Sequence, residues 1–296
     1  MEQKKIAILI PVFNEEKTIV KVIREFNKIL PEATIYVYDN NSIDNSYSLA
    51  IKEKCILRKE PKQGKGNVVR SMFRDIDADC YLMIDGDYTY SAKDAKKLCK
   101  LILEEKADMV IGDRLSSSYF KENKRLFHNF GNKLVRFLIN FLFKGNIKDV
   151  LSGYRAFSYE FVKSFPALSK KFEIETEMTI FAINNNFKIY SIPVIYRDRV
   201  KGSCSKLSTI KDGIKILDTI KKYFKLYYPK KYYGILGFIF FIIWMLLYLF
   251  NFTLGYQLLI SIIGIALFLL GSIIEVISIY NHQLIEIQLR LLRRKK

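Results

Sequence analysis

Asp85 and Asp87, two aspartates one residue apart, are the side chains of this sequence with the clearest capacity for chemistry. They directly follow the apolar run 80–84, which has the composition of a buried strand. Carboxylates at this spacing can converge on one hard divalent cation, Mg²⁺ or Mn²⁺. Such a cation can bridge the phosphates of a nucleotide and neutralise a departing diphosphate. Acidic turns without any function have the same spacing, so the interpretation depends on the motifs that accompany the pair.

Two polar loops earlier in the chain also follow apolar runs. Residues 11–16, Pro-Val-Phe-Asn-Glu-Glu, end the first run and open a helix, where the two glutamates either contact a nucleoside or simply suit the positive helix N-terminus. Residues 39–46, Asp-Asn-Asn-Ser-Ile-Asp-Asn-Ser, follow the second run. This loop can hydrogen-bond a base or a ribose, or it can form a plain turn with Asp44 as the helix cap. The residues alone leave both alternatives open.

Short β-rich runs must position these groups, and stretches with helical spacing separate them. The first helical stretch, 15–30, has its apolar residues on one face. Alternating strands and helices predict an α/β domain with a mostly parallel sheet covered on both faces, and ligands of such sheets bind beyond the carboxyl ends of the strands. That rule brings Asn14, Asp39 and Asp85 into one crevice. The strand runs are 6–12, 34–38, 55–58, 80–84 and 109–111.

The charge of the chain indicates an anionic partner. Its 296 residues include 48 basic and 30 acidic side chains, and the formal net charge is +18. Such an excess fits nucleic acid, an anionic membrane face or phosphate-bearing substrates. Much of it flanks the C-terminal apolar segments, so anionic lipid explains it and nucleic acid is disfavoured. Two histidines and four scattered cysteines disfavour a zinc site, a Ser-His-Asp triad and a disulfide framework.

Two uncharged apolar stretches near the C-terminus, 232–252 and 254–274, each have the length that crosses a bilayer. Basic residues flank this pair on both sides, so the sequence predicts a two-span hairpin with both termini in the cytosol, rather than a buried core hairpin. A basic, aromatic helix at 120–145 either faces a membrane or packs on the domain. The predicted organisation is an α/β domain at 1–205, an amphipathic juxtamembrane helix at 206–231, two spans at about 232–252 and 254–276 within 232–280, and a basic cytosolic tail at 281–296.

Together these motifs resemble those of family 2 glycosyltransferases with the GT-A fold, and the resemblance covers essentially the whole chain. The Gly-Lys-Gly-Asn motif at 64–67 completes the set in the first half. Downstream, the Asp-x-x-Ser-Gly-Tyr-Arg motif at 149–155 and the basic segment 196–199, followed by Lys206, resemble the branch that acts on polyprenyl (dolichyl or undecaprenyl) phosphate. A C-terminal pair of spans is typical of the bacterial and archaeal members of that branch.

The resemblance implies roles at the matching positions only. Asp149 and Asp87 would be catalytic, with Asp149 acting as a base or as a group that positions the acceptor. Asp85 and Asp87 would hold the metal ion. The acceptor phosphate would be met by Arg155, Arg197, Arg199 and Lys206, although a structural role for Arg155 is equally arguable. The donor would be bound by Pro11, Phe13, Asn14, Glu15, Asp39, Asn41, Lys65, Asp85, Gly86, Asp87 and Arg114.

The implied reaction is inverting transfer of one sugar from a nucleotide sugar to a polyprenyl phosphate at the cytosolic membrane face. Transfer to a sugar hydroxyl of a lipid-linked glycan is the alternative enzyme, and a degenerate binding or scaffold protein is the alternative class. Homo-oligomerisation is left open. The only tryptophan, Trp244, lies in the first apolar stretch, so the Gln-x-x-Arg-Trp motif of processive members is missing. Thr89 stands where dolichyl-phosphate mannose synthases usually have glutamine, which favours UDP-glucose or a UDP-N-acetylhexosamine over GDP-mannose.

Overall fold

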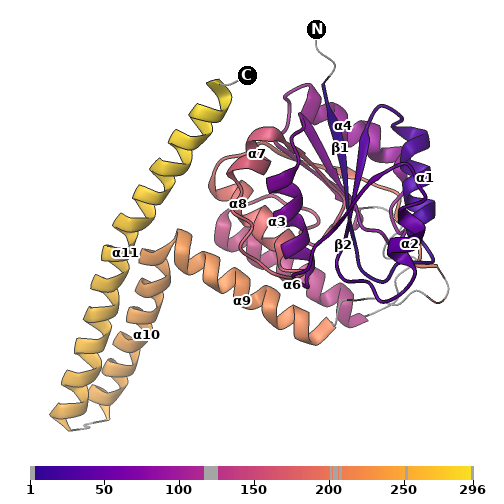
Figure 1. Cartoon of the computed structure of the whole chain (residues 1–296). Helices are drawn as coiled ribbons and strands as arrows, with labels where there is room; N and C mark the ends of the chain where they lie inside the picture. Colours follow the sequence, from indigo (N-terminus) through magenta and orange to yellow (C-terminus); the bar gives the residue numbers. More distant parts are fainter. Residues whose placement is uncertain are drawn as a thin grey trace. The chain divides into compact units, whose positions relative to one another are not determined.

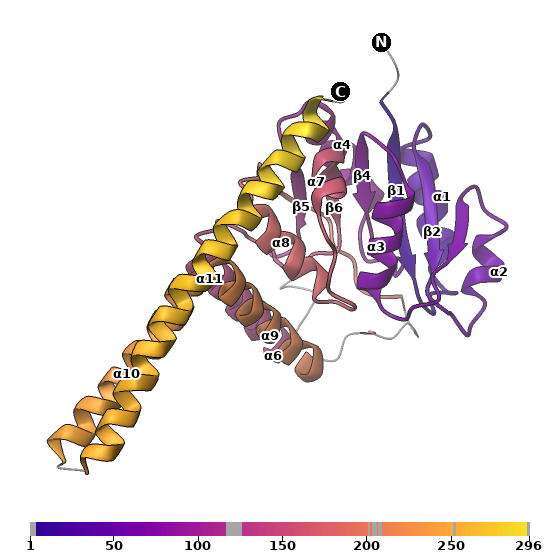
Figure 2. The same cartoon turned by 60° about the vertical axis from the view of Figure 1, so that its left-hand side comes forward.

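A computed structural model describes residues 4–116, 126–200, 202, 206, 209–250 and 253–294. The chain divides into two compact units, Met1–Thr219 and Ile220–Lys296. The first unit contains a twisted sheet with helices around it (Figure 1), and the second is built from long helices (Figure 2).

The sheet of the first unit has seven strands. These are β1 (Ile6–Val12), β2 (Thr34–Asp39), β3 (Ile56–Lys59), β4 (Cys80–Met83), β5 (Met109–Asp113), β6 (Arg155–Ser158) and β7 (Ile189–Pro193). Their order is β3-β2-β1-β4-β6-β5-β7. All neighbouring pairs are parallel except those of β6, which runs antiparallel to both β4 and β5. The predicted α/β fold with a mostly parallel sheet is therefore confirmed, and β6 and β7 lie beyond the strand runs that the sequence indicated.

Helices cover both faces of this sheet. They are α1 (Ile19–Ile29), α2 (Ser46–Ala50), α3 (Lys65–Asp75), α4 (Ala95–Leu103), α6 (Leu126–Phe143), α7 (Tyr159–Ser164) and α8 (Ile174–Asn184). Because side chains alternate along a strand, Ile8 and Ile10 of β1 both join the apolar core that α1 and α4 complete. On the other face, Phe73 of α3 meets Tyr81 and Phe157 edge-on. Figure 1 shows α1 and α3 on opposite sides of the sheet.

Helix α6 lies in the region where the sequence predicted a basic, aromatic helix. Ile139 and Phe143 are buried, whereas Phe137 and Phe141 are exposed and stack on each other with ring centroids 5.7 Å apart. One face of α6 therefore packs on the domain, and the other presents an exposed aromatic pair.

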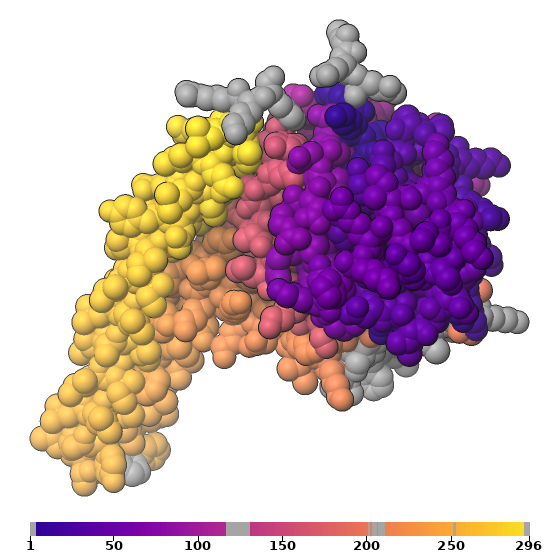
Figure 3. All heavy atoms as spheres, viewed as in Figure 1, coloured from indigo at the N-terminus to yellow at the C-terminus, as the bar shows by residue number. Residues whose placement is uncertain are grey.

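The second unit contains the end of α9 (Thr209–Tyr227) followed by α10 (Pro229–Leu249) and α11 (Leu254–Arg294). By length and composition, two helices of the described chain could cross a membrane, and they are α10 and α11. These two lie side by side (Figure 3), with glycines at the close contacts. A Cβ at Gly237 would lie 3.1 Å from the carbonyl oxygen of Gly264, and one at Gly271 would lie 2.8 Å from Cβ of Tyr233. The 41 residues of α11 continue well past residue 276.

Candidate active site

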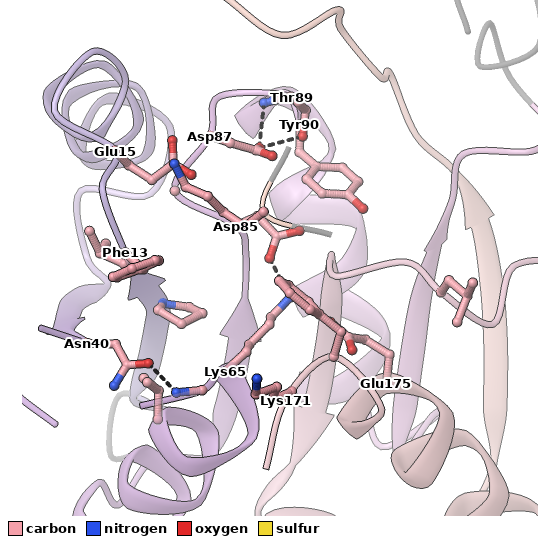
Figure 4. Close-up of a pocket in the computed structure, with 18 of the residues that line it drawn as sticks. Phe13, Glu15, Asn40, Lys65, Asp85, Asp87, Thr89, Tyr90, Lys171 and Glu175 are labelled. Atoms are coloured by element: carbon pink, nitrogen blue, oxygen red, sulfur yellow. Dashed lines mark hydrogen bonds and ion pairs between the residues drawn. The ribbon is translucent and has the colours of Figure 1, made fainter. Parts of the chain in front are cut away.

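A pocket of about 780 Å³ lies at the carboxyl ends of β1 and β4, and acidic and basic side chains share its wall (Figure 4). The acidic residues are Glu15, Asp85, Asp87, Glu175 and Asp198. The basic residues are Lys65, Arg114, Lys171, Arg199 and Lys206. Apolar and aromatic walls come from Pro11, Val12, Phe13, Val68, Tyr90, Leu151, Phe172, Tyr196 and Ile216. This is the edge of the sheet at which the sequence placed its motifs.

Each aspartate of the Asp-Gly-Asp motif forms an ion pair with a different basic side chain. Oδ1 of Asp85 lies 2.5 Å from Nζ of Lys65, and Oδ2 of Asp87 lies 2.6 Å from Nη2 of Arg199. Thr89 donates to Oδ1 of Asp87 through its backbone N–H (3.1 Å) and its hydroxyl (2.6 Å). The two carboxylates are thus held in fixed orientations just after the carboxyl end of β4.

The surroundings separate the pKa values of these two carboxyl groups. Burial tends to raise the pKa of Asp85, but Lys65, together with Arg199 and Arg114, outweighs burial and lowers it. Burial, followed by the charge of Asp85, raises the pKa of Asp87. Asp85 is therefore the carboxylate that stays ionised most readily, and Asp87 depends on nearby positive charge to do so.

Lys65 begins α3 and lies between two acids. Its Nζ is 2.6 Å from Oε1 of Glu175 as well as 2.5 Å from Asp85. Burial tends to lower the pKa of this lysine, but Asp85 and then Glu175 outweigh burial and raise it. Glycines on either side allow the loop to approach the chain at 169–171, because a Cβ at Gly66 would lie 2.2 Å from the carbonyl oxygen of Ser169. The Gly-Lys-Gly motif therefore places a permanent cation inside the site.

Gly153 provides the space that the carboxylate of Asp85 occupies. A Cβ at Gly153 would lie 2.3 Å from Oδ2 and 2.8 Å from Cγ of Asp85. Since Lys65 holds the other oxygen, the carboxylate cannot move away without losing that ion pair. This contact explains why the loop before β6 has a glycine beside the aspartate pair.

We therefore expect Gly153→Ala to lower sugar transfer about 100-fold, because misplacing a catalytic group by about 1 Å costs that much. The melting temperature should fall as well, because the shift of Asp85 that relieves the clash weakens its ion pair with Lys65. The measurement is initial rate and thermal unfolding of the purified full chain. Gly131→Ala is the matched control, because nothing lies within 4 Å of a Cβ there. Equal activity of the two variants would contradict the prediction.

Asp149, the predicted base or positioning carboxylate, lies outside the pocket wall and forms an ion pair with Arg114. Its oxygens accept from Nε (2.8 Å), Nη2 (3.0 Å) and the backbone N–H (3.1 Å) of Arg114. Asp149 is almost fully buried, whereas Arg114 lines the pocket. The geometry fits a group that orients an arginine.

Arg155 is entirely buried and is not part of the pocket wall. It donates to the carbonyl oxygens of Val150 (2.5 Å) and Ser152 (2.9 Å) and to the hydroxyl of Thr179 (3.0 Å). Burial lowers the pKa of its guanidinium to about 10. Of the two roles that the sequence allowed, the contacts match the structural one, in which Arg155 supports the loop that carries Gly153.

The basic segment after β7 runs along the residues that follow the aspartate pair. Tyr196 bridges to Tyr90, and the N–H of Arg197 donates to the carbonyl oxygen of Thr89 at 2.7 Å. The guanidinium of Arg197 forms two 2.8 Å bonds to Glu25 and lies outside the pocket wall. Arg199 and Lys206 do line the pocket, and Nζ of Lys206 donates to the carbonyl oxygen of Asn14.

The two polar loops organise each other. The side-chain oxygen of Asn14 accepts from the N–H of Ile43, and the amide of Asn41 donates to the carbonyl oxygen of Pro61. Asp39 is buried, with Oδ2 accepting from Ser42 and Oδ1 lacking a partner among the described residues. None of Asn14, Asp39 and Asn41 lines the pocket itself. The predicted donor residues that do line it are Pro11, Phe13, Glu15, Lys65, Asp85, Gly86, Asp87 and Arg114.

Several residues of this wall were not predicted from the sequence. Asn40 accepts from the N–H of Gly64 at 2.6 Å and donates to the carbonyl oxygens of Glu60 and Lys62, so it shapes the lysine loop. Lys171 comes from the segment that leads into α8, and Glu175 comes from the first turn of that helix. One signal was available for Glu175: it and Glu177 lie in a mostly apolar helix, and charged side chains are rarely buried unless they are paired.

The side-chain carboxyl group of Glu15 has a raised pKa. Burial, followed by the charge of Asp87, raises its pKa from 4.5 to about 7. The folded protein thus binds this proton more tightly than the unfolded chain, so its stability falls as the pH rises from about 5 through 7. We expect Glu15→Gln to remove that loss and to raise the melting temperature of the nucleotide-free protein at pH 8 but not at pH 5.

At pH 8 the substitution should raise the free energy of unfolding by at most about 3 kcal/mol. One pKa unit is worth about 1.4 kcal/mol, and solvent in the pocket weakens the effect. The measurement is thermal unfolding at both pH values, with Glu32→Gln as an exposed glutamate control. A gain from Glu15→Gln that is the same at pH 5 and pH 8 would contradict the assigned shift.

Asp85 and Asp87 fit a hard divalent cation by their donor chemistry. Within the described residues no cluster of three or more His, Cys, Asp or Glu side chains could hold a metal by itself. Mg²⁺ and similar ions, however, are commonly held by one or two carboxylates together with substrate phosphates and water. The site therefore suits a cation that binds together with a nucleotide.

Comparison with known proteins decides the family. The sequence model of Glycosyl transferase family 2 matches residues 7–165. The chain belongs to glycosyltransferase family 2. Glycosyltransferase AglJ of Haloferax volcanii is 35% identical over 234 residues, which cover 79% of this chain and 76% of that protein. This family 2 glycosyltransferase is thus an enzyme, as its motifs predicted.

Other relatives of this family 2 glycosyltransferase act, by name, on lipid phosphates. UDP-N-acetylglucosamine–dolichyl-phosphate N-acetylglucosaminyltransferase of Methanococcus voltae is 27% identical over 66% of this chain and 86% of that protein. Polyprenol monophosphomannose synthase of Mycolicibacterium smegmatis is 23% identical over 68% of this chain and 80% of that protein. The resemblance to the polyprenyl-phosphate branch is thereby confirmed.

Solved structures confirm the fold class. Glucosyl-3-phosphoglycerate synthase of Mycobacterium tuberculosis, in complex with Mn²⁺, UDP and glucosyl-3-phosphoglycerate, has a TM-score of 0.61 at 19% identity, covering 74% of this chain and 79% of that one. At this identity the likeness concerns the fold. The α/β domain of this glycosyltransferase thus has the same fold as a protein that was crystallised with Mn²⁺ and UDP.

Proposed function

We propose that this glycosyltransferase transfers one sugar from a UDP-sugar to a polyprenyl phosphate at the cytosolic face of a membrane. One observation carries the proposal: five cationic and five acidic side chains line the pocket, so a divalent cation on the aspartate pair would leave the site positively charged. A nucleotide diphosphate and a lipid monophosphate together supply the negative charge that such a site compensates. A neutral sugar hydroxyl as acceptor would supply much less of it.

Asp85 and Asp87 are the residues that would hold Mg²⁺ or Mn²⁺ on the donor side. Such a cation, when bound, neutralises charge on the departing diphosphate. Lys65 holds Asp85 in one orientation, and Thr89 does the same for Asp87. Arg199, which lies 2.6 Å from Asp87, would contact a phosphate group beside that aspartate.

The acceptor needs orientation more than it needs a base. A phosphate monoester has its second pKa near 6, so at neutral pH it is largely a dianion and already a nucleophile. We assign Asp149 a positioning role on this ground, because it holds the guanidinium of Arg114 against the pocket. Attack opposite the departing diphosphate inverts the anomeric centre.

The choice of UDP rests on Thr89 and on one relative. Thr89 contacts Asp87 directly, where mannose synthases of the family usually have the longer glutamine. The M. voltae relative is named for a UDP-N-acetylglucosamine donor. UDP-N-acetylhexosamine and UDP-glucose are therefore the favoured donors, and GDP-mannose is the alternative.

The membrane arrangement follows from the helices of the second unit. α10 and α11 would form a two-span hairpin with both termini cytosolic, preceded by the juxtamembrane helix predicted at 206–231. The boundaries predicted for the domain, spans and tail belong to this proposal. In sealed vesicles whose cytosolic face is outermost, protease added outside should then cleave the tail at 293–296. A protected tail would contradict the topology.

The decisive experiment is a donor panel. Purified full-length protein in lipid is given a polyprenyl phosphate and, separately, radiolabelled UDP-glucose, UDP-N-acetylglucosamine, UDP-N-acetylgalactosamine and GDP-mannose. We expect a UDP-sugar to label a lipid that mild acid cleaves, and chelator to stop the reaction. Label that enters a preformed lipid-linked glycan but never the lipid phosphate would establish the sugar-hydroxyl alternative. No transfer from any donor would support a binding or scaffold protein.

A further inference from the structure

The side chain of Arg197 is held by Glu25 of helix α1. Nη1 of Arg197 lies 2.8 Å from Oε2 of Glu25, and Nη2 lies 2.8 Å from Oε1, so the guanidinium and the carboxylate meet through two parallel hydrogen bonds. Nη2 of Arg197 also donates to the hydroxyl of Ser91 at 3.2 Å, and Oε1 of Glu25 also accepts from the N–H of Ala92 at 3.1 Å. This ion pair therefore joins α1, the residues that follow the aspartate pair, and the segment that follows β7.

The backbone of Arg197 continues the connection to Asp87. Its N–H donates to the carbonyl oxygen of Thr89 at 2.7 Å. Thr89 in turn donates to Oδ1 of Asp87 through its own N–H and its hydroxyl. Two residues after Arg197, the side chain of Arg199 contacts the other carboxylate oxygen of Asp87. Both oxygens of Asp87 are therefore oriented by groups that are attached to Arg197.

Tyr88, which lies between Asp87 and Thr89, has an unusual backbone conformation. Its φ angle is +63°, in the left-handed region that residues other than glycine rarely adopt. Cζ of Arg197 lies 4.6 Å from the centroid of the Tyr88 ring, and this cation–π contact helps to fix the ring. Strained residues persist only where the surrounding structure determines their position, and they cluster at functional sites. Arg197 thus supports the turn that directs Asp87 into the pocket.

We propose that Glu25 and Arg197 are positioning residues, which fix Asp87 and Arg199 in the orientation that a divalent cation and a phosphate group require. The inference rests on the proposed function, because it assumes that Asp87 binds the cation. Neither Glu25 nor Arg197 belongs to the pocket wall that the described residues form, so the pair acts through its neighbours. This role differs from the direct phosphate contact that the sequence predicted for Arg197.

The affinity of the purified full-length protein for Mn²⁺ in the presence of UDP tests the proposal. The electron paramagnetic resonance signal of free Mn²⁺ measures it without a transfer assay. Removing a group that orients a metal ligand typically weakens metal binding by about 10- to 100-fold, and we expect a loss of this size from Arg197→Gln and from Glu25→Gln. The double variant should be about as weak as either single variant, because both substitutions break the same contact.

Arg24 and Glu53 form the matched control pair. Arg24 also belongs to α1, and it donates to the carboxylate of Glu53 at 2.7, 3.0 and 3.1 Å. This pair has no printed contact with the residues around Asp87, so Arg24→Gln should leave Mn²⁺ binding unchanged. If Arg24→Gln and Arg197→Gln both lower the melting temperature and neither weakens Mn²⁺ binding, the Glu25–Arg197 pair is only structural and the proposal is wrong.

Two further variants complete the test. Arg197→Lys keeps the charge but loses the paired geometry, so it should weaken Mn²⁺ binding by a smaller factor than Arg197→Gln. It also serves, with Glu25→Gln, if Arg197→Gln does not fold, and unchanged Mn²⁺ binding in both would overturn the proposal. Asp87→Asn separates this inference from the proposed function. If Asp87→Asn weakens Mn²⁺ binding and Arg197→Gln does not, only this inference fails, whereas unchanged binding in Asp87→Asn overturns both.

Discussion

Asp85→Asn and Asp87→Asn are each expected to lower sugar transfer by about 10³-fold or more while the protein stays folded. Each substitution removes a negative charge that a divalent cation needs, and stabilisation of a departing group by preorganised charge is worth at least that much. Asp85 loses its ion pair with Lys65, and Asp87 loses its pair with Arg199. The measurement is the initial rate with the donor found in the panel, together with the metal concentration that gives half-maximal rate.

The matched control is Asp77→Asn, whose carboxylate is 80% exposed and pairs with Lys163 outside the pocket. It should keep the rate of the natural protein. If Asp85→Asn or Asp87→Asn kept near-normal transfer that resisted chelator, the assignment of the metal site to this pair would be wrong.

Lys65→Met is expected to abolish transfer and to lower the free energy of unfolding by about 3 kcal/mol or more. Removing one partner of a buried ion pair leaves uncompensated charge, which is among the most costly single changes. Here two acids, Asp85 and Glu175, would lose the same partner. Thermal and denaturant unfolding of the nucleotide-free protein measure the loss of stability, and a transfer assay measures the loss of activity.

A second substitution separates the structural from the functional part of this effect. Lys65→Met with Glu175→Gln removes one of the two unpaired charges, so part of the stability should return. Transfer should not return, because the cation inside the pocket is still missing. Full activity in Lys65→Met, or a melting temperature equal to that of the natural protein, would contradict the role assigned to Lys65.

Much of the fold could be predicted because it depends on local patterns. Strand–helix alternation predicted the α/β domain, and the apolar lengths after residue 231 predicted α10 and α11. The rule that ligands bind at the carboxyl ends of parallel strands brought the loops after β1, β2 and β4 together correctly. Strand β6 did not follow from alternation, because it is four residues long and antiparallel to both neighbours.

The exact partners inside the site could not be predicted in this way. Lys65 and Glu175 are 110 residues apart in the chain, and nothing in their local sequences says that they meet. Gly153 belongs to a motif that suggested acceptor chemistry, yet it lies against Asp85. Such contacts arise from packing between distant elements, and side-chain direction depends on that packing more than on sequence spacing.

By itself, the sequence determined the family, the aspartate pair and the two apolar helices, since residue type, motif spacing and hydrophobic length are properties of short segments. Only the tertiary structure decided which charged groups enter the pocket and which support it. Arg199 and Glu175 line the pocket, whereas Asp149 and Arg155 lie behind it. The reason is physical: a buried charge requires a partner, and the partner is chosen by three-dimensional proximity.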